Sequence, residues 1–358
     1  MFDASIQLKD FAHRYFGMLA ESCKVPAAPE FATPHRVIRE SSAYRLLEFA
    51  SDPYSVPTLI LPPQAGHHSA ICDLSRENSL VGTLLDNGVK SLHVVDWKPA
   101  THERANESLD DLISQTDQCI SAIGRPVNLI GLCQGGWQAV IYAALFPDNM
   151  KTLTAAGSPI DAHAGGGKIQ EALKFTPLSF FEALVDANGG TYPGQMQLLG
   201  FKLLNPLERF WGDYLKLFSA YGDFGFVARN HLFSNWYEYV QDLPGRWFMQ
   251  IVEGLFYKNG LCKNKLTVLG RQVNLSKIAC PVIMIAGTKD DITLPEQVFA
   301  LGGCVSTAVR FQHRFEVDSG HIGLFMGSKA LREVWPDVAR LLVEYHETSD
   351  VQAEMMWL

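Results

Sequence analysis

The stretch "NLIGLCQGGWQAVIYAALFPD", residues 128–148, holds a single cysteine at the junction of two different sequence patterns. The residues before Cys133 form an apolar run typical of a buried strand, and those after Gly136 carry apolar residues at the spacing of a helix. Gly131 and Gly135 bracket the cysteine, and small residues at these positions allow a strand to turn sharply into a helix. The stretch therefore predicts a strand, a tight turn and a helix, with the thiol of Cys133 at the tip of the turn.

A turn of this kind is the nucleophile elbow of α/β-hydrolases, where G-x-S-x-G normally holds a serine. Two apolar runs, "VPTLILPP" (56–63) and "KSLHVVDW" (90–97), read as further buried strands. Helical patterns follow each of them, in "ENSLVGTLLDNG" (77–88) between the two and in "ESLDDLISQTDQCISAIG" (107–124) before the elbow. The alternation predicts an α/β protein of the α/β-hydrolase fold, with a mostly parallel doubly wound sheet.

The chain is long enough for one catalytic core with an inserted cap. Between Phe175 and Tyr257, a span of 83 residues, lie 20 of the 39 aromatic residues, in a texture that fits no α/β unit. This enrichment as a whole predicts a mainly helical cap with an apolar substrate passage, although for any single aromatic there, packing in the interior of the cap is the favoured interpretation. The expected divisions are an N-terminal helix and connector (1–30), the first part of the core (31–161), the cap (162–264), the second part of the core (265–348) and a C-terminal tail (349–358).

Composition excludes several classes of partner. Lysine and arginine total 30 against 38 acidic residues, the formal charge is −8, and no basic run occurs, so nucleic acid is not expected as a partner. The N-terminal residues lack the pattern of a signal peptide, and no segment offers eighteen uncharged apolar residues, so we expect a cytoplasmic protein without a membrane span.

Metal binding is not expected either. The seven cysteines are scattered, without a C-x-x-C pair, which argues against a disulfide framework and a zinc site. His67 and His68 are adjacent, so they point in different directions, and no acidic residue lies near them in sequence. We expect neither a metal nor a bound cofactor.

A nucleophile at an elbow needs a histidine base and a carboxylate, in the chain order nucleophile, acid, histidine. The sequence supplies this order with Cys133, then Asp290 or Asp291 after the strand pattern "CPVIMIAG", then His321 after the strand pattern "VRFQHRFEV". Each follows the carboxyl end of a predicted strand. A Cys-His-Asp triad is therefore the predicted catalytic group, with the choice between the two aspartates open.

The oxyanion hole is expected to use two backbone N–H groups. One belongs to Gln134, the residue after the nucleophile, and the other to the loop "PPQAGHHSA" (62–70), with Gly66 as the expected donor. A thiolate is both a stronger nucleophile and a better leaving group than an alkoxide. The cysteine therefore favours transfer of an acyl group from a thioester such as acyl-CoA onto an alcohol.

Several segments resemble the polyhydroxyalkanoate synthases, over the chain from about residue 40 to residue 345. They are "LSRENSLVGTLLDNG" followed by "VVDW", the box "GLCQGG", "LPGRWFMQIVEGLFYKNGL", "LGRQVNLSKIACPV" and "SGHIGLFMGSKALREVWP". The short length and "CQGG" are most similar to the class that works with a second, non-catalytic subunit. This resemblance implies that Cys133 carries the acyl group, that Asp290 is the acid of the triad and that His321 is its base.

The resemblance implies an acyltransferase that polymerises 3-hydroxyacyl-CoA into polyhydroxyalkanoate with release of CoA, so that a CoA thioester is the substrate. It also implies a homodimer, a polyester chain or granule as partner, and a location in the cytoplasm or at the granule surface. The loop "PPQAGHHSAI" (62–71) and "KDDI" are more similar to the intracellular depolymerases, which would use the same triad, whereas Gly135 and Gly136 match the synthases. A third hypothesis is a catalytically silent granule-surface protein that adheres through its aromatic cap.

Overall fold

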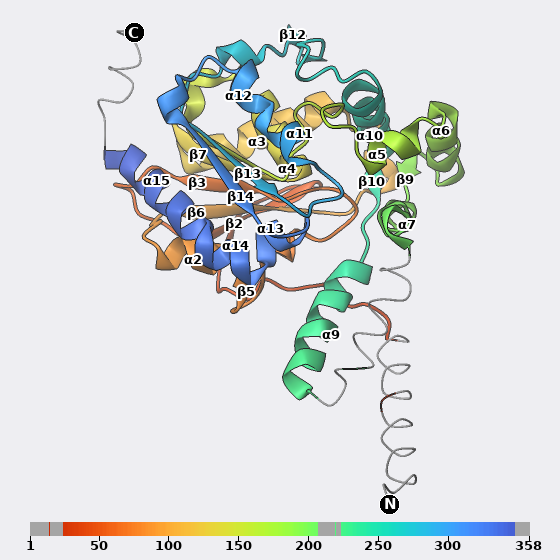
Figure 1. The fold of residues 1–358 in the computed structure, drawn as a ribbon, viewed down its shortest axis with the longest axis horizontal. Coiled ribbons are helices and arrows are strands. Elements are labelled where there is room, and N and C mark those ends of the chain that lie inside the picture. Colours follow the sequence, from red (N-terminus) through yellow and green to blue (C-terminus); the bar gives the residue numbers. More distant parts are fainter. Residues whose placement is uncertain (1–13, 15–23, 207–218, 220–222, 348–358) are drawn as a thin grey trace, which may run out of the picture.

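The computed structural model describes residue 14, residues 24–206, residue 219 and residues 223–347. The predicted N-terminal helix falls almost wholly on residues 1–13 and 15–23, and the predicted tail on residues 349–358, so both lie outside the described residues. Within the described residues, a single large sheet is flanked by helices on both faces, with a group of helices at one end (Figure 1).

The large sheet has eight strands in the order β1-β2-β6-β3-β7-β8-β13-β14. The strands are β1 (Arg36–Glu40), β2 (Tyr44–Ala50), β3 (Thr58–Leu61), β6 (Leu92–Trp97), β7 (Val127–Leu132), β8 (Met150–Ala156), β13 (Val282–Gly287) and β14 (Gln312–Val317). Every neighbouring pair from β6 to β14 is parallel, whereas β1 and β2 pair antiparallel at one edge. The predicted α/β architecture with a mostly parallel sheet is confirmed, and the antiparallel edge is an addition that the sequence patterns do not reveal.

The central strands are buried on both faces, which explains their continuous apolar runs. Alternate side chains of one strand enter different cores: Leu59 and Leu61 of β3 belong to one core and Ile60 to the other. The first core lies under α3 (Leu109–Ile123) and α4 (Gln134–Leu145), and the second under α2 (Leu80–Asp86) and α15 (Trp335–Glu347). The sheet is therefore held rigidly between two helical layers.

Short polar residues begin the helices that cover the sheet. The hydroxyl of Ser79 accepts a hydrogen bond from the N–H of Gly82 at 2.6 Å, which caps α2. Ser108 caps α3 in a reciprocal arrangement, in which the side chain of Asp111 accepts the N–H of Ser108 at 2.8 Å. Such caps satisfy N–H groups that have no partner within the helix, so they fix where each helix starts.

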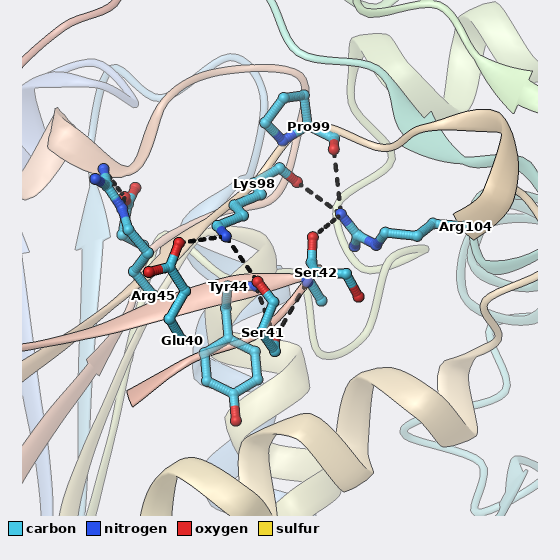
Figure 2. Close-up of polar contacts among 10 residues, drawn as sticks. Glu40, Ser41, Ser42, Tyr44, Arg45, Lys98, Pro99 and Arg104 are labelled. Carbon is cyan, nitrogen blue, oxygen red and sulfur yellow. Dashed lines mark hydrogen bonds and ion pairs between the residues drawn. The ribbon is translucent and has the colours of Figure 1, made fainter. Parts of the chain in front are cut away.

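The β1–β2 hairpin is tied to the end of β6 by two cations (Figure 2). The ammonium of Lys98 donates to the Glu40 carboxylate at 2.6 Å and to the Ser41 carbonyl at 2.7 Å. The buried guanidinium of Arg104 donates to the backbone carbonyl oxygens of Ser42, Lys98 and Pro99. These bonds satisfy backbone carbonyl groups in the turn between β1 and β2 and just after β6, which lie outside the strands.

The remaining elements of the core are short. They are the helices α11 (Pro295–Phe299), α12 (Leu301–Cys304), α13 (Gly323–Met326) and α14 (Ser328–Glu333), the 3-10 turns η1 (Ser69–Cys72), η2 (His102–Arg104), η3 (Pro147–Asn149), η6 (Leu275–Lys277) and η7 (Val309–Phe311), and the strand pairs β4 (Asp73–Ser75) with β5 (Asn78–Ser79) and β11 (Thr267–Val268) with β12 (Arg271–Gln272).

Between β8 and β11 the described chain is mainly helical. The elements are α5 (Lys168–Leu173), α6 (Leu178–Ala187), α7 (Gly194–Leu204), α9 (Phe224–Glu238), α10 (Gly245–Ile251) and the π-helix η5 (Val252–Tyr257), with a two-stranded pair of β9 (Thr191–Tyr192) and β10 (Leu243–Pro244). These helices, which we call the cap helices, gather on the side of the sheet that Figure 1 shows at the right. No helix in the described part of the chain is long and apolar enough to cross a bilayer.

Candidate active site

Cys133 lies in the turn between β7 and α4, at the carboxyl end of a central strand. Its backbone has φ 51° and ψ −115°, a conformation that residues other than glycine rarely adopt. Its N–H donates to the carbonyl of Ala156 at the end of β8, at 2.8 Å. The predicted strand, turn and helix are present, and a strained residue stands at the turn, as is common at functional sites.

The glycines around Cys133 are required because the turn brings backbone segments into contact. A Cβ atom at Gly131 would lie 2.6 Å from the carbonyl carbon of Gly135. One at Gly135 would lie 2.8 Å from the carbonyl carbon of Leu61 in β3. Both distances are far inside normal carbon–carbon contact of about 3.5–4.0 Å. The glycine pattern of the sequence is thus explained by the close approach of α4 to β3 and β7.

Asp290 lies in the loop after β13, and its two carboxylate oxygens have different partners. Oδ1 accepts the N–H groups of Ile292 and Thr293, both at 2.9 Å, which fixes the carboxylate in one orientation. Oδ2 lies 2.7 Å from Nδ1 of His321. The carboxylate is therefore held so that one oxygen remains for the histidine.

His321 follows β14, and its ring is buried beside Phe325. Burial opposes the charged form of His321, but the Asp290 carboxylate and the Cys133 sulfur outweigh this effect and raise its pKa well above the ordinary value. Nε2 is buried without a hydrogen-bond partner among the described residues, and Cys133 lies in the wall of the same cavity as His321. A thiol beside an imidazole with this proton affinity can transfer its proton to the ring.

Asp291 points away from the histidine and toward the cap helices. Its carboxylate pairs with Lys168 of α5 at 3.3 Å and accepts a hydrogen bond from the Asn205 side chain at the end of α7. The two aspartates that the sequence left as alternatives thus have different surroundings. The Asp290 carboxylate is the one in contact with His321.

The residues expected to form the oxyanion hole come from the start of α4 and from the loop after β3. Gln134 is the first residue of α4, and its side-chain oxygen accepts the N–H of Gln64. Gly66 has φ 87°, and its carbonyl accepts the N–H of Gln241 at 2.8 Å. The use of Gln134 and Gly66 as donors remains a prediction. Ala65 also lies beside Cys133, but no sequence pattern singles it out because only its backbone could take part.

The two adjacent histidines of the same loop face different neighbours. The ring of His67 stacks on Trp236 and Tyr237 of α9, with ring centroids 5.0 and 5.3 Å apart, and burial lowers its pKa to about 4. Nε2 of His68 lies 3.7 Å from the Asp96 carboxylate. Among the described residues, no group of three or more histidine, cysteine or acidic side chains is arranged to hold a metal ion.

Two cavities meet at Cys133. The first, which we call the histidine-side cavity, has a volume of about 650 Å³, and its wall includes His67, Asn78, Lys168, Lys289 and His321. The second, which we call the cap cavity, has a volume of about 570 Å³ and lies among α5, α6, α7 and α10. Its wall includes Trp137, Phe181, Met196, Trp247 and Phe248. Cys133 therefore borders one cavity whose wall includes charged side chains and one whose described lining residues include none.

Proteins of known sequence and structure resemble the chain over most of its length. A protein of Haloferax mediterranei named "Poly(3-hydroxyalkanoate) polymerase subunit PhaC" is 29% identical to this chain, in an alignment that covers 88% of this chain and 65% of the relative. A protein of the same name from Synechocystis is 27% identical, and the alignment covers 84% of this chain and 81% of the relative. The chain thus spans about two thirds of the length of the haloarchaeal relative. These relatives confirm the resemblance to the polyhydroxyalkanoate synthases.

Solved structures bear on the fold. The monoacylglycerol lipase of Paleococcus ferrophilus has a TM-score of 0.51 at 18% identity, covering 84% of this chain and 99% of that one. The putative non-heme bromoperoxidase BpoC of Mycobacterium tuberculosis has a TM-score of 0.50 at 14% identity, covering 88% and 97%. The predicted α/β-hydrolase fold is confirmed.

The model of the family described as "Protein of unknown function (DUF3141)" matches residues 42–330, which include the elbow and the loops of Asp290 and His321, so the chain belongs to the DUF3141 family.

Proposed function

We propose that this protein is an acyltransferase that polymerises 3-hydroxyacyl groups from CoA thioesters, with the growing acyl chain held on Cys133. The observation that carries the proposal is the 2.7 Å contact of His321 with the Asp290 carboxylate, in a cavity whose wall includes both His321 and Cys133. The similarity to proteins named as poly(3-hydroxyalkanoate) polymerase subunits supports this substrate class.

The first half-reaction loads the enzyme. His321 takes the proton of the Cys133 thiol, and the sulfur attacks the thioester carbonyl carbon of the acyl-CoA. The bond from that carbon to the sulfur of CoA breaks, and the CoA sulfur leaves with the proton that His321 returns. The products are free CoA and an acyl thioester on Cys133.

The second half-reaction extends the chain. His321 removes the proton of the 3-hydroxyl group of a second 3-hydroxyacyl-CoA, whose oxygen attacks the carbonyl carbon of the acyl group on Cys133. A carbon–oxygen ester bond forms, the bond to the Cys133 sulfur breaks, and His321 returns the proton to the thiolate. The lengthened chain is then itself a CoA thioester, and the loading step on that thioester returns the chain to Cys133 and releases CoA. Asp290 stabilises the protonated ring in both steps and holds its orientation. A thioester is replaced by an ester, so no further energy source is needed.

Product analysis with 3-hydroxybutyryl-CoA tests this function. We expect free CoA together with insoluble polymer. Replacement of Cys133 by alanine should abolish both, whereas Cys304→Ala, at a partly buried cysteine that lines neither cavity, should not. Free CoA with only monomeric hydroxy acid would contradict polymerisation and indicate a hydrolase.

The depolymerase hypothesis uses the same three residues and differs in the group that resolves the acyl-enzyme. In a depolymerase, water or CoA attacks the acyl thioester in place of a chain-end hydroxyl group. Amorphous polyester granules therefore separate the two activities. Soluble hydroxy acid or its CoA ester, released from granules by the parent protein and not by Cys133→Ala, would support the depolymerase; polymer made from acyl-CoA alone would support the synthase.

A further inference from the structure

The two cavities at Cys133 share a short stretch of wall, and their other lining residues are different. Besides Cys133, the shared wall consists of Ala65, Phe201, Leu204 and Ile292. Since the sulfur lies at the junction, a molecule bonded to it can extend in two directions. The chemistry of the two walls indicates which part of the substrate each side receives.

The histidine-side cavity opens beside a positive cluster. Lys289 lines its wall, is 69% exposed at the side chain, and pairs with Asp318 at 2.8 Å. The same carboxylate pairs with Lys329 at 3.3 Å. Two ammonium groups therefore share one carboxylate, which leaves a local positive charge on a chain whose formal charge is −8.

The other lysine of this cavity contributes little free charge. Lys168 is paired with the carboxylate of Asp291, which also lines the cavity. The positive excess is therefore near Lys289, whose exposed side chain is in contact with solvent. A thiol carrier with phosphate groups at the far end of a flexible arm can place its negative charge at such a solvent-exposed position while its thioester reaches Cys133.

The cap cavity has a different character. Among the described residues that line it, none carries a charged side chain. Its wall continues into exposed apolar side chains in the turn after α5 and on α6 and α7: Phe175 (88% exposed), Leu203 (58%), Phe180 (46%) and Leu199 (39%). We call these four residues the apolar rim.

The apolar rim extends the cap cavity to the surface of the protein. An acyl group that ended inside the cavity would bury its apolar surface against the inner wall alone. Exposed aromatic and aliphatic side chains that continue the same wall outward suit an occupant that itself continues outward, because contact with it removes their surface from water. A polyester chain is such an occupant.

Building on the proposed function, we infer that the two cavities divide the substrate: the CoA carrier enters and leaves by the histidine-side cavity with its phosphates at Lys289 and Lys329, and the growing polyester leaves through the cap cavity and over the apolar rim. With this division, the CoA thioester and the growing polyester follow separate paths to and from Cys133. The next acyl-CoA can reach Cys133 while the chain remains in the cap cavity.

The carrier route is tested with a pair of thioesters that differ only in the carrier. The Lys289→Ala/Lys329→Ala protein is assayed with 3-hydroxybutyryl-CoA and with the 3-hydroxybutyryl thioester of N-acetylcysteamine, which lacks phosphates. We expect the KM for the CoA thioester to rise about fivefold, less at high salt, because exposed charge contacts are weak and screened. The KM for the small thioester should not change.

A matched control exists for the lysines. Lys258 is 67% exposed and pairs with Glu253 at 2.7 Å, so it resembles Lys289 in exposure and pairing, but it lines neither cavity. Lys258→Ala should leave both KM values unchanged. If the double variant changes the two KM values equally, or neither of them, the assignment of the carrier is wrong.

The polymer route is tested at the apolar rim. Leu203→Glu places a charge where the chain would pass, so we expect polymer of at least severalfold lower mean mass for the same amount of CoA released. Leu232→Glu is the control, since Leu232 on α9 is 45% exposed and outside both cavities. Polymer of parent length from Leu203→Glu overturns the exit route. A parent protein that releases neither CoA from the CoA thioester nor N-acetylcysteamine from the small thioester refutes the proposed function itself, and the inference with it.

Discussion

The packing of the elbow against the loop after β8 predicts that Ser158→Gly restores most of the stability lost in Gly136→Ala. A Cβ atom at Gly136 would lie 2.6 Å from the Cβ of Ser158 and closer still to its hydroxyl oxygen. Both residues are buried. Normal contact needs about 3.5–4.0 Å, so Gly136→Ala forces α4 and the loop apart by about 1 Å.

The magnitude follows from the surroundings of the clash. Overpacking of a dense interior costs roughly 1–3 kcal/mol, and the rigid backbone on both sides of Gly136 points to the upper end, about 3 kcal/mol for Gly136→Ala. Ser158→Gly should cost about 1 kcal/mol, because it loses the 3.1 Å hydrogen bond to the Ala156 carbonyl and adds backbone freedom. In the double variant the next obstacle is the Gly131 carbonyl oxygen, at 3.2 Å, which small shifts can relieve.

The assay is guanidinium chloride unfolding of the parent, both single variants and the double variant, followed by far-ultraviolet circular dichroism. We expect the double variant to lose only about 1 kcal/mol, which gives a coupling energy of roughly 2–3 kcal/mol between the two sites. Gly303→Ala is the control, because a Cβ atom there would meet open space. Additive losses at Gly136 and Ser158, or a stable Gly136→Ala protein, would refute the packing argument.

Three other predictions concern the thiol and two histidines. Cys133→Ser should still be acylated but should lose most chain extension, because the serine ester is a poorer acyl donor than a thioester; mass spectrometry should detect a persistent acyl-serine, and polymer at the parent rate would contradict this. Because the pKa of His321 is raised in the folded state, its contribution to the free energy of unfolding is complete below about pH 6.5 and is lost as the pH rises through the folded value; the free energies of unfolding of the parent and His321→Gln should therefore converge as the pH rises above about 6.5, and a constant difference would refute this. The pKa of His67 is lowered to about 4, so its contribution is present above about pH 6.5 and about 3 kcal/mol is lost as the pH falls toward 4; His67→Gln should flatten this acid loss, and an unchanged pH dependence would exclude His67 as its source.

The sequence by itself determined the parts of this protein that depend on local pattern. The apolar runs of β3, β6 and β7 and the glycines around Cys133 predicted the central strands and the elbow, because burial on both faces and close backbone approach each demand particular residue types. The chain order of a cysteine, two aspartates and a histidine also followed from sequence, since parallel strands bring their carboxyl ends to one edge.

Only the tertiary structure decided which way the loop side chains point. Asp290 and Asp291 are adjacent, yet one contacts His321 and the other Lys168 of the cap helices. No periodicity orients residues in an irregular loop, so long-range contacts set their directions. The antiparallel pairing of β1 with β2 also depends on segments that meet only after the chain has folded, and so does the division of the site, among the described residues, into a cavity with charged side chains and a cavity without them.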